Sequence, residues 1–281
     1  AEDRLERGRA YGRIGNRQLA IEDPLAWPTY RGDARRTGRT PGSVLDDLAV
    51  TWKAQLGTKL SSPVVAEGKV LTAAVDEYTL HCRSADDGRA LWTYTTGGRI
   101  DSPPTIHNGT AVFGCRDGWV YCVHLDDGQL VWRFRAAPQP RLVGAFGRLE
   151  SAWPVHGSVL VRNGVAYFAA GTSSFLDNGI YVFGIDAATG ELRYETRLHG
   201  PDPQAEAGRV TAGRMPGAVA DILTCDDTGL YLRHVKMDWE LTAPPPEQFV
   251  WGLKGETHLL TGSGFLDDTL FNRTVWQYGN R

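Results

Sequence analysis

A set of short motifs recurs after 40 residues in the first half of the chain. Ser62-Pro63 returns as Ser102-Pro103, and Trp92 returns as Trp132. Two further matches keep the same order and spacing: Cys82 with Cys122, and Asp86-Asp87-Gly88 with Asp126-Asp127-Gly128. Self-similarity at a fixed period of about 20 to 50 residues is typical of repeat architectures. The sequence therefore predicts a chain built from one repeated unit.

Each unit has the pattern of four short strands. In the second unit we expect strands over 103–107, 110–115, 119–125 and 129–135, with hairpin turns at Asn108-Gly109 and Asp117-Gly118. The alternation of Leu130, Trp132 and Phe134 places these side chains on one face. A lone four-stranded sheet leaves both faces in water, whereas stacking such sheets around an axis buries them, with the tryptophan between neighbours. The predicted fold class is all-β, a β-propeller of four-stranded blades.

The pattern continues with decreasing regularity. We divide the chain into an N-terminal extension over 1–26 and a propeller over 27–281, whose units cover about 58–98, 99–139, 150–199, 216–240 and 256–281. The third unit carries an insertion over 173–179, and the fourth is expected to have one strand over 230–235. Residues 48–56 resemble the fourth strand of a blade, but the first three strands of that blade do not precede them in the sequence. With four to five units visible and seven to eight expected in a ring, we expect a further segment or chain to complete the propeller.

Composition narrows the class of protein. The chain has 33 Gly, 9 Trp and 10 Tyr but only 2 Met, which suits many turns and short strands. Its formal net charge is −3 with mixed signs, and this argues against a dedicated nucleic-acid binder. No stretch approaches the roughly 18 apolar residues needed to span a bilayer. The sequence begins Ala-Glu-Asp without a leader, as a mature secreted protein or the middle of a longer chain would.

Several motifs together resemble the PQQ-like repeat family, which includes quinoprotein dehydrogenases and the BamB-type outer-membrane assembly lipoprotein. They are Ser-Pro-x-Val, the Gly-x-Val hairpin and Asp-x-x-(Thr or Asp)-Gly-x-x-x-Trp, and they cover roughly residues 27–199. The segment WPTYRGDARRTG is similar to a subgroup of secreted bacterial propellers. The resemblance implies a periplasmic or secreted location. It does not imply PQQ, since the calcium-binding carboxylate and amide set of the quinone enzymes has no match and no two cysteines are adjacent.

Departures from the repeat are the candidate functional residues. Glu150, Trp153 and His156 stand before the hairpin of the third unit, in a segment lengthened by 138–149. Glu150 and Trp153 are candidates for binding. A histidine at a strand end can be a general base or a metal ligand, although most such residues are partly buried and bonded to the backbone.

Two Phe-Leu-Asp loops, which contain Asp177 and Asp267, are 90 residues apart and would lie on one side of the ring. With His156, Arg233, His234 and Arg273 they would line a polar central funnel. The catalytic candidates are His156, Asp177, His234 and Asp267, and the added binding candidates are Arg233 and Arg273. Such a funnel would bind a cation such as Ca²⁺ or a charged sugar, or support β-elimination. Alternatively, each aspartate caps its own turn.

Two other groups have structural interpretations. The cluster Arg31, Asp33, Arg35 and Arg36 is either an anion patch or a solvated crossing segment that docks on a blade. Cys115 would face Val120 across the turn with Cys122 diagonal to it, a geometry that does not favour a disulfide. The four cysteines are instead expected to be buried small residues of strands.

Two classes of function follow. The first is a non-catalytic extracytoplasmic propeller that binds a protein or a polysaccharide as a scaffold. The second is a carbohydrate-active enzyme, a lyase or hydrolase, with its site in the funnel. A PQQ-dependent dehydrogenase is a third and less favoured interpretation.

Overall fold

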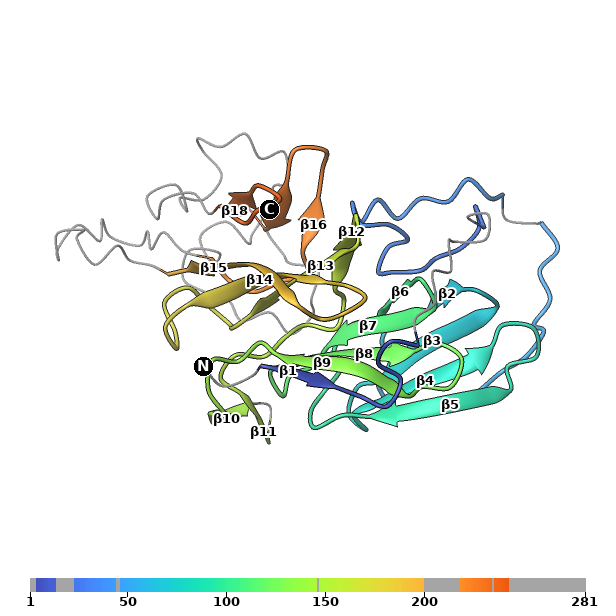
Figure 1. Ribbon diagram of the computed structural model, residues 1–281. Helices are drawn as coiled ribbons and strands as arrows, with labels where there is room; N and C mark the ends of the chain where they lie inside the picture. The colour runs from blue at the N-terminus through green and yellow to red at the C-terminus, as the bar shows by residue number, and fades with distance from the viewer. Residues whose placement is uncertain are drawn as a thin grey trace, which may run out of the picture.

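The computed structural model describes residues 4–13, 23–43, 46–145, 147–199, 218–233 and 235–242. In these residues all regular structure is β-strand, arranged in antiparallel sheets that follow one another along the chain (Figure 1). No helix long and apolar enough to cross a membrane occurs among them.

Four of these sheets are blades. The first orders β2 (Val64–Ala66), β3 (Lys69–Ala74), β4 (Thr79–Ser84) and β5 (Ala90–Thr95) from inner to outer strand. The second has β6 (Thr105–His107), β7 (Thr110–Gly114), β8 (Trp119–His124) and β9 (Leu130–Arg135). The third has β12 (Leu160–Arg162), β13 (Val165–Ala170), β14 (Ile180–Asp186) and β15 (Leu192–Leu198). The fourth shows β16 (Thr224–Cys225), β17 (Leu230–Leu232) and β18 (Val235–Met237). The predicted all-β propeller with blades of four strands is confirmed.

The hydrophobic core lies between blades. One cluster joins blade 1 to blade 2, with Leu71 and Leu80 against Phe113. A second joins blade 2 to blade 3, with Phe134 against Phe183, and a third joins blade 3 to blade 4. Blades 2 and 3 therefore bury both faces against neighbours, and either of them in isolation would expose both faces to water.

In each of the first two repeats a tryptophan docks on the turn of the following blade. The indole N–H of Trp92 donates to the Leu125 carbonyl at 2.8 Å, and that of Trp132 donates to the Ala187 carbonyl at 3.3 Å. The ring needs a glycine beneath it, since a Cβ on Gly128 would lie 2.7 Å from Trp92. The 40-residue period thus records a repeated contact between blades.

Trp52 makes the same contact although its own segment, 48–56, is not assigned as a strand. Its N–H donates to the Ala85 carbonyl at 2.9 Å, and a Cβ on Gly88 would lie 2.5 Å from its ring. The segment therefore holds the position of a fourth strand, as its sequence predicts, while the ladder that would define a strand is not formed within the part of the chain described.

Strand β1 (Leu5–Arg7) comes from the segment that precedes the propeller in the sequence. It pairs antiparallel with β9 and so adds a fifth strand to the outer edge of blade 2. Arg4 extends the contact to blade 3, with its guanidinium 4.8 Å from the centre of the Phe183 ring and 3.3 Å from Glu195. This part of the N-terminal extension fastens two blades together.

Residues 27–36 contact the inner strands of blades 1 and 2 and the start of blade 4. Trp27 bridges to Val65 of blade 1, and the Pro28 carbonyl accepts the Ile106 N–H of blade 2. Further on, Arg36 donates to the Leu223 carbonyl next to blade 4. The predicted crossing segment is present, but Arg36 is not solvated: it is 3% exposed, and burial lowers its pKa to about 10.

Two local predictions are wrong. Residues 230–235 are not one strand, because Arg233 adopts a positive φ of 53° and reverses the chain between β17 and β18. In the β7–β8 hairpin Gly114 pairs with Val120, so Cys115 does not face Val120 and the turn is longer than two residues. Cys82, Cys115, Cys122 and Cys225 are free and buried, as expected of small strand residues.

Candidate functional site

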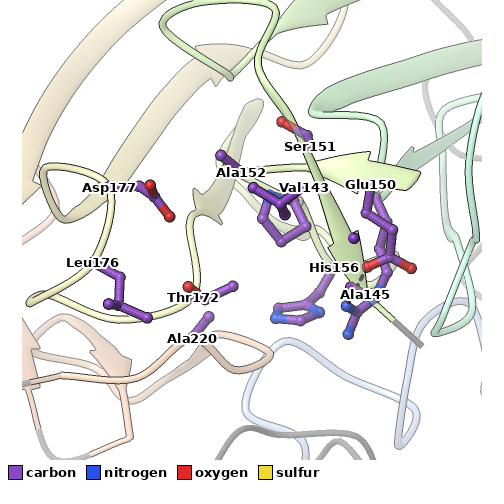
Figure 2. Close-up of a pocket in the computed structure, with 13 residues that line it drawn as sticks. Val143, Ala145, Glu150, Ser151, Ala152, His156, Thr172, Leu176, Asp177 and Ala220 are labelled. Atoms are coloured by element: carbon purple, nitrogen blue, oxygen red, sulfur yellow. Dashed lines mark hydrogen bonds and ion pairs between the residues drawn. The ribbon is translucent and has the colours of Figure 1, made fainter. Parts of the chain in front are cut away.

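The two insertions into the repeat meet over a pocket of about 410 Å³ (Figure 2). One insertion forms the hairpin β10 (Leu142–Ala145) and β11 (Arg148–Ser151), and the other is the 173–179 loop between β13 and β14. The lining residues come from both insertions, from blade 2 and from the starts of blades 3 and 4: Arg116, Val143, Gly144, Ala145, Glu150, Ser151, Ala152, Pro154, His156, Thr172, Leu176, Asp177 and Ala220. The volume is in the range of small-molecule sites.

His156 is held at the base of this pocket by close backbone packing. A Cβ on Gly157 would lie 2.1 Å from the Ser102 carbonyl oxygen, and one on Gly114 would lie 2.1 Å from the His156 carbonyl oxygen. Only glycine permits these approaches, which bring the start of blade 3 onto blade 2. As a result His156 Nδ1 lies 2.7 Å from Asp101 Oδ2, and the Gly157 N–H donates to Asp101 Oδ1 at 3.0 Å.

Beneath His156 the charges form a continuous buried network. Arg116 donates to Asp101 at 2.9 Å through Nε and to Glu150 at 2.9 Å through NH1. Arg99 donates to the other oxygen of Glu150 at 2.6 Å. The side chains of all four residues are at most 6% exposed. Two guanidinium groups and two carboxylates therefore neutralise one another inside the protein.

The network keeps Asp101 ionised. Burial by itself would raise the pKa of this carboxyl. The charges of His156 and Arg116, with hydrogen bonds from His156 and Gly157, oppose that effect and hold the pKa of Asp101 well below its usual range. Because the ionised Asp101 only accepts hydrogen bonds, His156 Nδ1 donates to it, and Nε2 is the ring nitrogen left to meet a ligand.

The outer wall of the pocket carries a second ion pair. Asp177 Oδ1 lies 2.7 Å from Arg141 NH1, and the Asp177 carbonyl accepts the indole N–H of Trp153 at 2.8 Å. Asp177 and Asn178 both have positive φ, at 49° and 67°, so the loop turns sharply where the carboxylate is presented. The pair joins the segment before β10 to the 173–179 insertion.

The structure brings three of the predicted site residues together: His156, Glu150 and Asp177 all line the pocket. Trp153 lies behind it in the core, 2% exposed. Arg233 is buried elsewhere and paired with Asp221 at 3.2 Å. His234, Asp267 and Arg273 lie outside the described residues.

Sequence reasoning missed Asp101, Arg116, Arg99 and Thr172. Asp101 precedes the repeated Ser102-Pro103, where blade 1 has Ser61 before Ser62-Pro63, so the departure from the repeat was visible in the sequence. Its partner His156 is 55 residues away, and no local pattern links the two.

The site combines paired charges with neutral groups. Arg116 and Glu150 are engaged with one another, and Asp177 is engaged with Arg141. Apart from these, the lining consists of the His156 ring, hydroxyls such as that of Thr172, and apolar walls that include Val143, Pro154 and Leu176. Among the residues that the structure describes, no three His, Cys, Asp or Glu side chains gather as metal ligands would. Such a site offers hydrogen bonds and apolar contact without an uncompensated charge.

A family model described as outer membrane protein assembly factor BamB matches residues 43–212, more than half of the chain. Among solved structures, the quinohemoprotein alcohol dehydrogenase of Comamonas testosteroni is 20% identical with a TM-score of 0.51, covering 66% of this chain and 29% of its own. Quinohemoprotein alcohol dehydrogenase ADHIIG of Pseudomonas putida HK5 is 19% identical with a TM-score of 0.49, covering 64% of this chain and 28% of its own. BamB of Moraxella catarrhalis is 12% identical with a TM-score of 0.31, and the match covers 64% of this chain and 66% of the BamB chain.

This chain therefore spans less than a third of the length of the two dehydrogenases. No curated protein sequence matches it. At these identities the similarity to solved structures concerns the fold.

Proposed function

The chain belongs to the PQQ-like repeat family of the outer membrane protein assembly factor BamB, and we propose that it is a non-catalytic extracytoplasmic propeller module that binds a neutral sugar residue of a glycan. The binding site is the pocket between the two insertions. The location outside the cytoplasm is part of the proposal, and it is supported by membership in the family of an outer-membrane assembly factor.

The single observation that supports a neutral ligand is the pairing of every guanidinium and carboxylate group that lines the pocket. A ligand carboxylate would have to compete for Arg116 with Asp101 and Glu150, which hold that guanidinium at 2.9 Å each. Breaking a buried pair of this kind is costly. Hydroxyl groups can instead bond to His156 and Thr172, while Pro154 and Leu176 cover the apolar face of a sugar ring.

The same observation argues against the quinone that names the repeat. PQQ is a polycarboxylate, so a site for it needs cationic groups that are available to the ligand. The pocket cations are already paired, and no three metal-ligating side chains meet in the described part of the chain. The residues present do not fit that cofactor, and the proposed function does not use it.

Titration calorimetry with neutral and carboxylated oligosaccharides tests the proposal. Neutral hexose and N-acetylhexosamine trisaccharides should bind, and the corresponding uronate trisaccharides should bind at least tenfold more weakly. Thr172→Val should lower the affinity for the neutral ligand by about tenfold, which corresponds to the loss of one hydrogen bond to a buried partner. Thr93→Val, at an exposed site on β5, is the matched control and should leave the affinity unchanged. Preferential binding of uronates would overturn the proposal.

A second candidate is a hydrolase, and it is favoured by the Asp101–His156 hydrogen bond. An aspartate that orients a histidine leaves Nε2 able to accept a proton from water as a general base. The paired state of Arg116 disfavours a lyase, which needs a free cation for the substrate carboxylate. Release of reducing ends from the bound trisaccharide, abolished by His156→Gln, would support the hydrolase over the non-catalytic module.

A further inference from the structure

We propose that Asp177 determines the charge specificity of the pocket. Its carboxylate accepts a hydroxyl group of a neutral sugar, and it masks the Arg141 guanidinium from acidic sugars. This role rests on the proposed function, and it names the residue by which the same site rejects a uronate. Two ion pairs lie at the pocket, Arg116 with Glu150 and Arg141 with Asp177, and only the second lies near the surface.

The two pairs differ in exposure. The side chains of Arg116 and Glu150 are 6% and 3% exposed, and a ligand that separated them would leave a charge in the interior. The side chains of Arg141 and Asp177 are 53% and 21% exposed. Exposed ion pairs contribute little to stability, because water solvates the separated charges. The outer pair is therefore the one whose charges a ligand can meet, and a change in it should leave the fold intact.

The Asp177 carboxylate is presented to the ligand. Its Oδ1 lies 2.7 Å from Arg141 NH1, so Oδ2 is the oxygen left to accept a hydrogen bond from a ligand. Asp177 lines the pocket, and Figure 2 shows its carboxylate on the side of the 173–179 loop that faces the cavity. A carboxylate accepts hydrogen bonds and donates none, so it favours a ligand hydroxyl and repels a ligand carboxylate.

The backbone holds Asp177 in place independently of its side chain. Its φ is 49°, a conformation that aspartate and asparagine tolerate better than most residues. Its carbonyl accepts the indole N–H of Trp153 at 2.8 Å, a contact that a change of side chain leaves in place. Asp177→Asn therefore removes the charge and keeps the shape of the loop. It also takes from Arg141 the carboxylate that pairs with it beside the pocket.

Titration calorimetry with a neutral hexose trisaccharide and the corresponding uronate tests the proposal, in about 0.15 M salt so that distant charges are screened. Asp177→Asn should bind the uronate at least about tenfold more tightly than the wild type does, because a charge-assisted bond to Arg141 replaces repulsion. Its affinity for the neutral sugar should stay within about threefold, since the asparagine carbonyl still accepts a hydroxyl. Adding Arg141→Gln to this variant should abolish the gain for the uronate.

Two further variants serve as checks. Glu191→Gln removes the same charge from the exposed pair with Arg7, neither of which lines the pocket, and it should leave both affinities unchanged. Arg141→Gln alone unmasks the Asp177 charge, so it should weaken the uronate further and keep the affinity for the neutral sugar. The urea midpoint of Asp177→Asn should stay close to that of the wild type, because the outer pair is exposed.

The outcomes separate this proposal from the proposed function. A wild type that binds no neutral trisaccharide would overturn both. A wild type that binds it, with the same ratio of neutral to uronate affinity in Asp177→Asn, would overturn only the role of Asp177. A gain for the uronate that persists after Arg141→Gln would also overturn that role, since the guanidinium would not be its source.

Discussion

Asp101 and His156 lie 55 residues apart in the chain, yet Asp101 Oδ2 and His156 Nδ1 are 2.7 Å apart. The contact joins the start of blade 2 to the start of blade 3 and fixes which ring nitrogen of His156 meets a ligand. It depends on glycine at 157, where any side chain would collide with the Ser102 carbonyl. The candidate site is thus produced by the packing of successive blades and by the two insertions that cover it.

Removing Glu150 should destabilise the fold strongly. Its carboxylate bonds to Arg99 and Arg116, and Glu150→Ala would remove one of the two carboxylates that balance these buried guanidinium groups. We expect a loss of about 3 to 5 kcal/mol in the free energy of unfolding, measured by urea denaturation. Glu191→Ala, which breaks an exposed pair with Arg7, should cost at most about 1 kcal/mol. Similar losses for the two variants would contradict the buried network.

Lowering the pH should reduce the stability of the folded protein because Asp101 becomes protonated. The folded state holds the pKa of this carboxyl far below the value of about 3.9 in the unfolded chain. The unfolded chain therefore binds more protons below about pH 4, and the stability that is present above that pH is lost as the pH falls. The urea midpoint of the wild type should decline from pH 5 to pH 3. The urea midpoint of Asp101→Asn should be lower than that of the wild type at pH 5 and should decline less between pH 5 and pH 3. An equal decline in the two proteins would contradict the low pKa of Asp101 in the folded state.

The four cysteines should be unreactive in the folded protein. All are buried, and burial raises the pKa of the Cys82 thiol to about 12 and that of Cys122 to about 12. Because the thiolate is the reactive form, a thiol-specific chromogenic disulfide should label none of them in native buffer and all four in denaturant. Fewer than four thiols in denaturant without reductant would reveal a disulfide that this structure lacks.

The docking tryptophans should differ in their effect on stability. Trp132 is fully buried between blades 2 and 3, so Trp132→Ala should cost about 3 to 5 kcal/mol. Trp52 contacts blade 1 and is only half-buried, so Trp52→Ala should cost clearly less. Thermal unfolding of both variants measures the difference, and an equal cost would mean that Trp52 lies in a complete interface.

Much of the fold follows from the sequence because the 40-residue period reflects one contact made repeatedly. Trp92 and Trp132 mark it, and the Asn108-Gly109 turn lies between the expected strands. The fourth blade was harder to predict, since nothing local shows that Arg233 would take a positive φ and end β17. Its position was predicted, but the boundary of its strands was not.

The site was only partly predictable for a related reason. His156 and Asp177 depart from the repeat, and both line the pocket. Asp101 and Arg99 belong to the network through contacts across 51 to 55 residues, which no spacing rule indicates. Whether Arg233 would line the same pocket could not be read from the sequence, because its pairing with Asp221 depends on the local turn.

The imidazole ¹⁵N spectrum of His156 tests the central claim most directly, using the wild type and His156→Gln to assign the signal. On addition of a neutral trisaccharide, the Nε2 signal should shift while Nδ1 keeps the position of a protonated nitrogen bonded to Asp101. The corresponding uronate should cause no such shift at the same concentration. A shift with the uronate alone, or an Nε2 signal that no neutral sugar alters, would contradict the proposal that this pocket binds a neutral glycan.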